Sequence, residues 1–465
     1  MIANGLRPKG CFRRMFSDLQ PFQPPKVALE KLAACLVDEI DDTIGGSTKV
    51  PFAGYTYLGQ FVDHDLNLTL ISVSESEHIP PEKTPNYHSA VLDLDHLYGD
   101  GPGCENGVFE NSQGGPIFAL GKTIPDNQKR DLPRDSNGLP KTNDPRSDET
   151  LILAQLHVLF LRFHNAVVAW LSQAARNNDL PKNKSRYETV RRIVIWHYQW
   201  IVLNEYLPAV LHPDTLAKEF QTQQPRKTAL DIPVEFSVAA FRFGHSMVRN
   251  AYRRITVKPA PEDPTSIATL FMLTGAAGGA KPNLPDVWLI DWARFFPELG
   301  PSALVNFARK IDTRLAKTLH NLPSSSVGDP PDLAARSLIR GSNVGLPTGQ
   351  DVAARLGIPL LKAEEIASPA CTEVIEENGF DCKTPLWYYI LREAELRTDG
   401  KTLGPTGTCI VSRIILDALR GDPDSILNQK PGRWVPFLPS DTPGAFRMCD
   451  LVNFVDKWAD RVPAS

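Results

Sequence analysis

The chain has 465 residues, enough for one large domain or two to three ordinary ones. Its 42% hydrophobic and 22% charged residues are typical of a globular protein and exclude a disordered or fibrous chain. A net charge of −4 gives no electrostatic reason to expect nucleic acid or an anionic membrane as a partner. We find no run of about 18 apolar residues and no apolar stretch after the basic N-terminal residues, so we expect neither a membrane span nor a signal peptide.

The seven cysteines are scattered along the chain. An odd, sparse set is not typical of a disulfide framework, and no CxxC pair indicates a zinc site. We therefore expect reduced thiols and a cytoplasmic location as the sequence is written, with export by another route as the alternative. The cysteines are Cys11, Cys35, Cys104, Cys371, Cys382, Cys409 and Cys449.

Forty prolines divide the chain into short segments and predict many loops between helices. We expect residues 1–25 to be a loosely ordered lead-in and residues 26–465 to form one catalytic domain. Residues 100–145, rich in Gly, Pro, Asn and Asp, predict a long surface excursion. Strand signals are few and short, so the predicted fold class is mainly α.

Periodicity predicts several helices in chain order. The segment 150–173 is apolar nearly all round and should be buried. Pro208 should end the helix before it, because proline cannot continue the hydrogen-bond ladder. The predicted helices cover 27–41, 150–173, 187–207, 234–252, 302–320, 350–356, 384–396 and 408–419.

His64 lies between two acids, Asp63 and Asp65, in an otherwise apolar segment. A buried carboxylate needs a partner, so three adjacent titratable groups indicate a metal, a charged cofactor or a catalytic network. The alternatives are a solvated loop and a metal phosphohydrolase. The phosphohydrolase would want a histidine ligand upstream, and His64 is the first histidine in the chain.

Two further segments carry candidate chemistry. In SAVLDLDHLYG, Ser89, Asp93 and Asp95 alternate oxygen side chains around a free carbonyl, which suits calcium; the alternative is an ordinary acidic turn. In FRFGHSMV, His245 follows Gly244, which leaves room for a flat group, and Arg242 lies one helical turn before it. That pattern suits an iron ligand beside a propionate-binding cation. The alternative is a core histidine.

Taken together, these segments resemble the peroxidase–cyclooxygenase superfamily, the animal-type haem peroxidases. The motifs run in order from about residue 54 to about residue 420. GQFVDHDL resembles the distal segment, which implies that His64 is the distal base and that Gln60 lies beside it over the iron. By the same match Asp63 is a haem-ester position and Asp65 a calcium position.

SAVLDLDHLYG resembles the calcium loop of that family. The resemblance assigns Ser89, the Val91 carbonyl, Asp93 and Asp95 as ligands together with Asp65. The family more often has a hydroxyl residue where this chain has Asp95. The ion would hold the His64 segment against this loop.

DPRSDETLILAQLHVLFLRFHN resembles the segment that begins with the distal arginine. Arg146 would polarise the O–O bond of peroxide, and Glu149 would be the second haem-ester carboxylate. Thr150 stands where one mammalian subgroup has methionine, so no third link is expected. The alternative is that Arg146 and Glu149 are an ordinary pair at a helix N-terminus.

AFRFGHSMV and RSLIRGSNVGLP resemble the proximal segments. They imply that His245 is the axial ligand and that Arg242 and Arg340 bind propionates. Cyclooxygenases and fatty-acid dioxygenases carry a tyrosine at the position of Arg242, which favours a peroxidase here. Ser337 stands where the family has an asparagine that accepts a hydrogen bond from the proximal imidazole, and its shorter reach would leave that ring less anionic.

The resemblance implies a haem peroxidase that reduces hydrogen peroxide and oxidises a small organic donor or a halide through a ferryl intermediate. The implied cofactors are calcium and haem b, either free or esterified through Asp63 and Glu149. One alternative is a haem-dependent oxygenase or tailoring enzyme acting on a lipid or a secondary metabolite. Another is a non-catalytic haem-binding protein, which would need none of Gln60, His64 and Arg146.

Overall fold

The computed structural model describes most of the chain, and the gaps fall between and beyond its main elements. Parts of the predictions lie outside the described residues: 39–41 and 302–304 of two predicted helices, 104–107 of the predicted surface excursion, and the first residues of the predicted lead-in. The described residues are 7–38, 50–72, 80–103, 108–173, 185–222, 231–253, 264–275, 282–296, 299, 305–322, 330–429 and 434–462.

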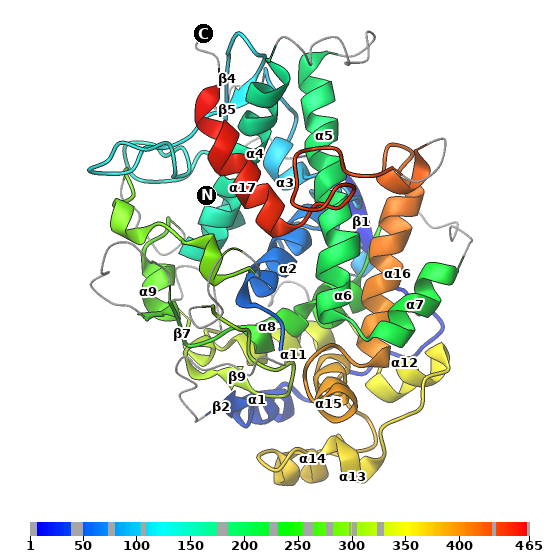
Figure 1. Cartoon of the computed structure of the whole chain (residues 1–465). Helices are drawn as coiled ribbons and strands as arrows, with labels where there is room; N and C mark the ends of the chain where they lie inside the picture. Colours follow the sequence, from blue (N-terminus) through cyan, green and yellow to red (C-terminus); the bar gives the residue numbers. More distant parts are fainter. Residues whose placement is uncertain are drawn as a thin grey trace.

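The fold is mainly α, as predicted, and short strands occur only in small sheets (Figure 1). The helices are α1 Lys26–Ala34, α2 Ala53–Leu66, α3 Asp95–Tyr98, α4 Leu151–Leu171, α5 Arg186–Ile201, α6 Leu207–Val210, α7 Pro213–Gln221, α8 Gly244–Met247, α9 Ile267–Met272, α11 Leu333–Asn343, α12 Gly349–Leu356, α13 Ala363–Ile366, α14 Thr372–Glu377, α15 Leu386–Thr398, α16 Pro405–Gly421 and α17 Met448–Trp458. The strands are β1 Gly10–Arg13, β2 Val37–Asp38, β3 Pro85–Asn86, β4 Phe109–Glu110, β5 Ile117–Phe118, β6 Ile232–Pro233, β7 Ala251–Tyr252, β8 Thr265–Ser266 and β9 Leu315–Ala316.

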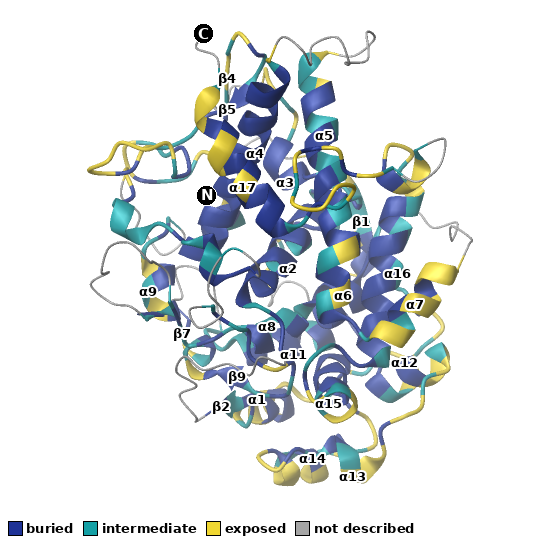
Figure 2. Cartoon of the chain, in the orientation of Figure 1, coloured by how far each residue is buried: buried dark blue, intermediate teal, exposed yellow. Residues whose placement is uncertain are grey.

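Helix α4 is the centre of the core, and every one of its 21 residues is buried (Figure 2). The hydroxyl of Thr150 caps its start by accepting the Leu153 N–H at 3.3 Å. By length and composition α4 could cross a membrane, although its sequence contains no unbroken run of about 18 apolar residues. The rest of the protein covers this helix on all sides, however, as expected for the core helix predicted at 150–173.

Helix α2 packs on α4 and carries the predicted distal residues. The ring of Phe61 is buried and stacks on Phe160 of α4, with the ring centroids 4.4 Å apart. The sequence showed only an apolar stretch here, because 12 of the 14 helix residues are buried and no amphipathic period remains to indicate a helix. This packing fixes the side of α2 that holds Gln60 and His64.

The predicted end of a helix at Pro208 is wrong. The chain passes from α5 through a π-helical turn at Val202–Tyr206 directly into α6. Pro208 stands in the first turn of α6, where the missing N–H costs no hydrogen bond. The π turn therefore lets the helix direction continue past the proline.

Two other predicted helices are wrong. The segment 234–252 is a π turn at Glu235–Ala239, a 3-10 turn at Ala240–Phe243, the four-residue α8 and then strand β7. Described residues 305–316 of the segment 302–320 are not helical and end in β9, with a 3-10 turn only at Lys317–His320. In both segments apolar side chains are buried in several directions, so apolar spacing there reflects burial rather than a helix.

Part of the predicted lead-in is paired with the main body. Strand β1 lies between β3, to which it is antiparallel, and β6, to which it is parallel. The buried carboxylate of Glu235 accepts the N–H groups of Met15 and Phe16 at 2.8 and 3.2 Å. These contacts attach the N-terminal segment to the turn that precedes α8.

The expectation of reduced thiols is wrong for one pair. A disulfide joins Cys35, just after α1, to Cys371, just before α14. Because 336 positions separate them, no local spacing pattern could reveal the pair. Cys11, Cys382, Cys409 and Cys449 are not in disulfides, and Cys104 lies outside the described residues.

Removing this cross-link should destabilise the fold. We expect Cys371→Ser to lower the free energy of unfolding by about 2–5 kcal/mol, because the unfolded chain gains freedom. Denaturant unfolding under non-reducing conditions measures it, and Cys382→Ser, which removes an exposed free thiol, is the control. Equal stability of the two variants would contradict the cross-link.

Candidate functional site

A cavity of about 310 Å³ lies between α2, the turns before α8, α8 itself and α11. It brings together residues that are far apart in the sequence. Eight of the nine residues predicted to act on or hold a cofactor line it, and the ninth, Ser337, lies directly behind one of them. The eight are Gln60, Asp63, His64, Arg146, Glu149, Arg242, His245 and Arg340.

His64 is 4% exposed and lines the cavity from α2. Its backbone carbonyl accepts a hydrogen bond from His88 Nδ1 at 2.5 Å and a longer one from Arg146 Nη2 at 3.4 Å. Burial lowers the pKa of His64 well below its ordinary value, and the positive charge of Arg146 lowers it further. The imidazole is therefore neutral near pH 7 and can accept a proton.

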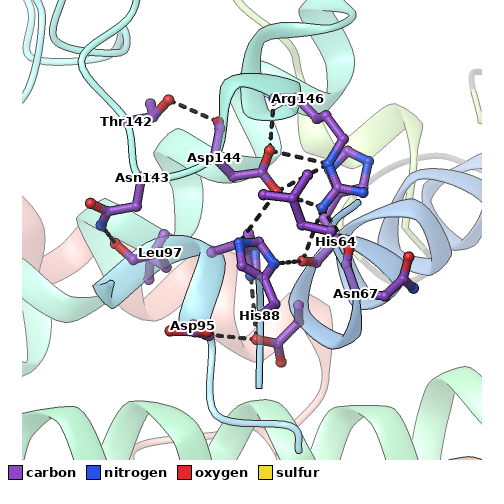
Figure 3. Close-up of polar contacts among 12 residues, drawn as sticks. His64, Asn67, His88, Asp95, Leu97, Thr142, Asn143, Asp144 and Arg146 are labelled. Atoms are coloured by element: carbon purple, nitrogen blue, oxygen red, sulfur yellow. Dashed lines mark hydrogen bonds and ion pairs between the residues drawn. The ribbon is translucent and has the colours of Figure 1, made fainter. Parts of the chain in front are cut away.

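Arg146 is held by Asp144, whose side chain is fully buried (Figure 3). Asp144 accepts the Arg146 backbone N–H at 2.8 Å and its Nη2 at 2.6 Å, and Arg146 Nη2 also donates to the Asn67 carbonyl at 2.7 Å. Burial by itself raises the pKa of Asp144, but the charge and hydrogen bond of Arg146, together with the nearby histidines, outweigh this and hold that pKa far below the usual range. The arginine thus keeps a fixed orientation and a full counter-charge.

His88 lies between the His64 carbonyl and the Asp144 carboxylate. Its Nδ1 bonds the His64 carbonyl, and its Nε2 lies 3.8 Å from Asp144 Oδ2 (Figure 3). Neither Asp144 nor His88 was predicted as a site residue. The only signals in the sequence are their positions, two residues before Arg146 and one before Ser89.

Two carboxyl groups also face the cavity. Gln60 Nε2 donates to Glu149 Oε2 at 2.8 Å, and Asn67 Nδ2 donates to Asp63 Oδ1 at 2.9 Å. Burial raises the pKa of both acids, and Arg146 opposes that shift in each. Both predicted ester positions therefore lie where a bound cofactor would meet them.

On α8, His245 lies against Ser337 of α11, with 3.3 Å between Nδ1 and Oγ. The Ser337 hydroxyl donates its hydrogen to the Leu333 carbonyl at 2.9 Å, so its oxygen is left to accept the Nδ1–H of His245. Burial, and then the charge of Arg242, lowers the pKa of His245 to about 3. The ring is therefore neutral, and this tautomer leaves the lone pair on Nε2 for a metal.

Three arginines line the cavity without a carboxylate in hydrogen-bond contact among the described residues. Two of them donate to backbone carbonyls, Arg242 Nε to Ser237 at 3.0 Å and Arg340 Nη1 to Ile71 at 3.3 Å. Two other nitrogen atoms, Arg340 Nε and Arg336 Nη1, are buried without an acceptor among the described residues. Burial and then the other two arginines lower the pKa of Arg340 to about 10. Arg336 was not predicted; its signal was its position one helical turn before Arg340.

These groups fit a haem. Buried arginines that lack an acceptor suit two propionates, a neutral histidine suits iron, and the open space at Gly244, where an added Cβ would meet nothing within 4 Å, suits a flat ring.

The predicted calcium ligands lie together behind α2. Asp65 Oδ1 accepts the Asp95 N–H at 2.7 Å, and Ser89 Oγ donates to Asp93 Oδ1 at 2.6 Å. The other carboxylate oxygen of Asp65, Oδ2, is buried without a hydrogen-bond partner in the described part of the chain. Burial raises the pKa of Asp65 and of Asp93 to about 7. The Val91 carbonyl accepts the Asp93 N–H at 3.1 Å.

Asp95 is already engaged in this cluster. Its carboxylate accepts Lys9 Nζ at 2.6 Å and the Ser89 N–H at 2.9 Å. Within the described ranges, no group of three His, Cys, Asp or Glu side chains is arranged to hold a metal. The oxygen-rich donor set and the unpartnered Asp65 oxygen still fit a hard cation, but Asp95 would have to leave Lys9 to bind one.

Comparisons with known proteins identify the family of this chain. A family model described as animal haem peroxidase matches residues 67–423. Heme peroxidase 2 of Caenorhabditis elegans is 30% identical over 359 residues, covering 72% of this chain and 47% of that protein. Lactoperoxidase of Mesocricetus auratus is 25% identical over 435 residues, covering 80% and 58%. A peroxidase-like protein of Margaritifera margaritifera is 28% identical over 330 residues, covering 63% and 39%.

The chain thus spans less than two thirds of each of these relatives. Among solved structures, peroxidase A from Dictyostelium discoideum superposes with a TM-score of 0.59 at 17% identity, covering 98% of this chain and 95% of that one. A fatty acid α-dioxygenase of Oryza sativa gives 0.58 at 14% identity, covering 87% and 76%. At such identities these structures show a shared fold.

The buried pair of Asp144 and Arg146 should contribute far more to stability than an exposed pair. We expect Asp144→Asn to lower the free energy of unfolding by about 3 kcal/mol, because it leaves the guanidinium without its counter-charge. The matched control is Asp424→Asn, which breaks the exposed pair with Arg192 at 2.9 Å and should cost less than about 1 kcal/mol. Similar losses in both variants, measured by denaturant unfolding, would contradict the buried pair.

Proposed function

The chain belongs to the animal haem peroxidase family, and from that premise we propose that it is a haem peroxidase that reduces hydrogen peroxide and oxidises a small organic donor or a halide. One observation carries the proposal: a single cavity holds Gln60, His64 and Arg146 together with the neutral imidazole of His245. A protein that only stored or carried haem would need none of the first three.

His245 would hold the iron of haem b, and Arg242, Arg336 and Arg340 would bind its propionates. When bound, the haem supplies the redox chemistry. Asp63 and Glu149 present carboxyl groups to the same space and are the residues that would form ester links.

The residues around the cavity move and stabilise charge during the reaction. His64 accepts a proton from hydrogen peroxide and returns it to the departing oxygen, which leaves as water. Arg146, held in place by Asp144, stabilises negative charge on the peroxide oxygens, and the Gln60 amide provides a second polar group beside it. For a donor AH the balance is H₂O₂ + 2 AH → 2 H₂O + 2 A•, so each donor loses one electron and one proton.

The predicted calcium ligands would bind the ion through Asp65, Asp93, Ser89 and the Val91 carbonyl. Two buried carboxylates with raised pKa values gain most from a divalent partner. Asp95, held by Lys9, is the weakest of the predicted ligands. Because Asp65 directly follows His64, the ion would hold the distal segment in place.

A haem-dependent oxygenase is the second candidate, because one wall of the cavity is apolar and would suit a lipid. Arg242 argues against it, since it occupies the position where the dioxygenases resembled by the proximal segment have a tyrosine. Oxygen uptake that depends on an added fatty acid and needs no peroxide would identify this activity. The apolar wall includes Ile267, Phe271, Leu319, Leu322, Leu333 and Val344.

Loading with haem and mixing with peroxide tests the main proposal. The protein should give a histidine-ligated ferric spectrum that changes rapidly when peroxide is added in a stopped-flow instrument. His64→Ala should keep the ferric spectrum but slow this change by about 100-fold or more, because the proton acceptor is gone.

The matched control is His320→Ala, which removes a histidine paired with Asp332 and should react like the wild type. An unchanged rate in His64→Ala would contradict the distal role. If the protein takes up no haem, a non-haem metal site becomes the better explanation of Asp63, His64 and Asp65.

Calcium should stabilise the protein through Asp65. At a calcium concentration one hundred times Kd, binding to the folded state alone contributes about 2.7 kcal/mol, so the unfolding temperature should rise with calcium and fall with a chelator. Asp65→Asn should abolish this response, whereas Asp214→Asn, in the first turn of α7, should keep it. If the unfolding temperature of the wild type does not change with calcium, the proposed calcium site is contradicted.

A further inference from the structure

A second cavity, of about 490 Å³, lies between α4, α17 and the segment 286–293. It shares no lining residue with the first cavity among the described residues. Side chains that shape its polar and aromatic character are Arg130, Arg162, Asp286, Trp292, Asn453 and Asp456. We call it the α4–α17 groove.

Trp292 lies between this groove and the core. Its side chain is 9% exposed and belongs to a short 3-10 turn, Trp292–Arg294, which Asp291 caps by accepting the Ala293 N–H at 3.1 Å. The backbone of the next residues is held against α2, because the Gly54 N–H donates to the Phe295 carbonyl at 2.9 Å. A Cβ at Gly54 would collide with Phe295 and with the Phe296 ring, so this close approach requires glycine.

A continuous row of aromatic rings leads from Trp292 to the first cavity. The centroids of Trp292 and Phe295 are 5.9 Å apart, those of Phe295 and Tyr252 are 5.9 Å apart, and those of Tyr252 and Tyr57 are 5.7 Å apart. Tyr57 is buried on α2 and lines the first cavity. Every step is thus a direct ring contact inside the core.

A second row runs beside the first. Trp292 also lies 5.9 Å from the Phe296 ring, and Phe296 lies 5.8 Å from Tyr55, which lines the first cavity as well. Both rows start at the same indole. Trp292 is therefore the point from which the groove is connected to the proposed haem site.

We propose that the α4–α17 groove is a second donor site, at which a bulky phenolic reductant that cannot enter the first cavity gives one electron to Trp292. The inference rests on the proposed peroxidase function, because hydrogen peroxide is the oxidant. Each peroxide takes two electrons and two protons to give two waters, and two phenols each lose one electron and one proton to become phenoxyl radicals. The electrons pass through the ring rows, while the phenol protons go to solvent at the groove and the cavity takes up its protons from solvent.

The chemistry of the side chains assigns the radical to Trp292. An indole can lose an electron while it keeps its proton. Burial raises the pKa of the Tyr57 phenol well above its ordinary value, so this ring holds its proton and serves as a bridge. The ring nearest the groove therefore carries the oxidising equivalent.

The polar lining of the groove favours a phenol without negative charge. Asp126, Asp286, Asp291 and Asp456 outnumber Arg130 and Arg162. Arg162 is only 4% exposed and pairs with Asp460 at 3.2 Å, but its Nε is buried without a hydrogen-bond partner in the part of the chain described. Because Arg162 lines the groove, a phenol oxygen bound there would accept a hydrogen bond from its guanidinium.

The test compares one phenol in two sizes. Free tyramine can enter the first cavity, whereas tyramine coupled to dextran cannot. With haem-loaded protein and peroxide, Trp292→Phe should lose oxidation of dextran–tyramine and keep that of free tyramine. The control is Trp200→Phe, because Trp200 is also partly buried and ring-packed, 6.0 Å from Trp434, yet lines neither cavity.

A readout apart from turnover is electron paramagnetic resonance after peroxide is added without a donor. The wild type and Trp200→Phe should show a tryptophan radical that Trp292→Phe lacks. Equal oxidation of dextran–tyramine by Trp292→Phe and wild type would overturn the groove as a donor site. Failure of the wild type to oxidise free tyramine would instead overturn the peroxidase proposal, on which this inference rests.

A second variant keeps the test decisive if Trp292→Phe does not load haem. Arg162→Gln leaves both ring rows intact and removes the proposed contact to the phenol. It should raise the concentration of dextran–tyramine that gives half the maximal rate and leave that of free tyramine unchanged. An unchanged value for both donors would overturn the assignment of the groove.

Discussion

The ion pair between Asp144 and Arg146 is the interaction on which the distal side of the cavity depends. A guanidinium in this position stabilises negative charge on a ligand only if its own orientation is fixed beforehand. Asp144 provides that orientation through the backbone N–H and the side chain of Arg146 at once. Arg146 also donates to the His64 carbonyl, which accepts His88 Nδ1 as well, so the backbone of His64 and the guanidinium are held in one network.

This network also explains why a buried charge is tolerated at the site. Asp144 is fully buried, and an isolated carboxylate there would be protonated rather than charged. The charge and hydrogen bond of Arg146, with the neighbouring histidines, lower the pKa of Asp144 despite its burial, so the carboxylate stays ionised. On the other side of the cavity the positive charges are less well balanced: besides burial, Arg242 and Arg336 both lower the pKa of Arg340. An anionic ligand would relieve that repulsion, whereas the pair of Asp144 and Arg146 is complete within the protein.

How far the sequence predicts this structure depends on the kind of contact. The long apolar helix α4 and the motifs around His64, Arg146 and His245 could be recognised, because each lies within a short segment. The Cys35–Cys371 bridge could not, since only packing brings the two cysteines together. The apolar spacing of the segment 234–252 predicts one helix, but its apolar side chains are buried in several directions, so that spacing reflects burial around irregular turns.

That irregular backbone is itself part of the site. A regular helix through 234–252 would place Arg242 and His245 one turn apart on one face, with their spacing set by the helix alone. The π turn and the 3-10 turn instead let Arg242 donate to the Ser237 carbonyl while His245 begins a separate short helix against Ser337. Glu235 fixes the start of this segment by accepting the N–H groups of Met15 and Phe16, just after β1, so the N-terminal segment supports this side of the cavity. The N-terminal residues therefore contribute to the position of His245 although none of them carries a catalytic group.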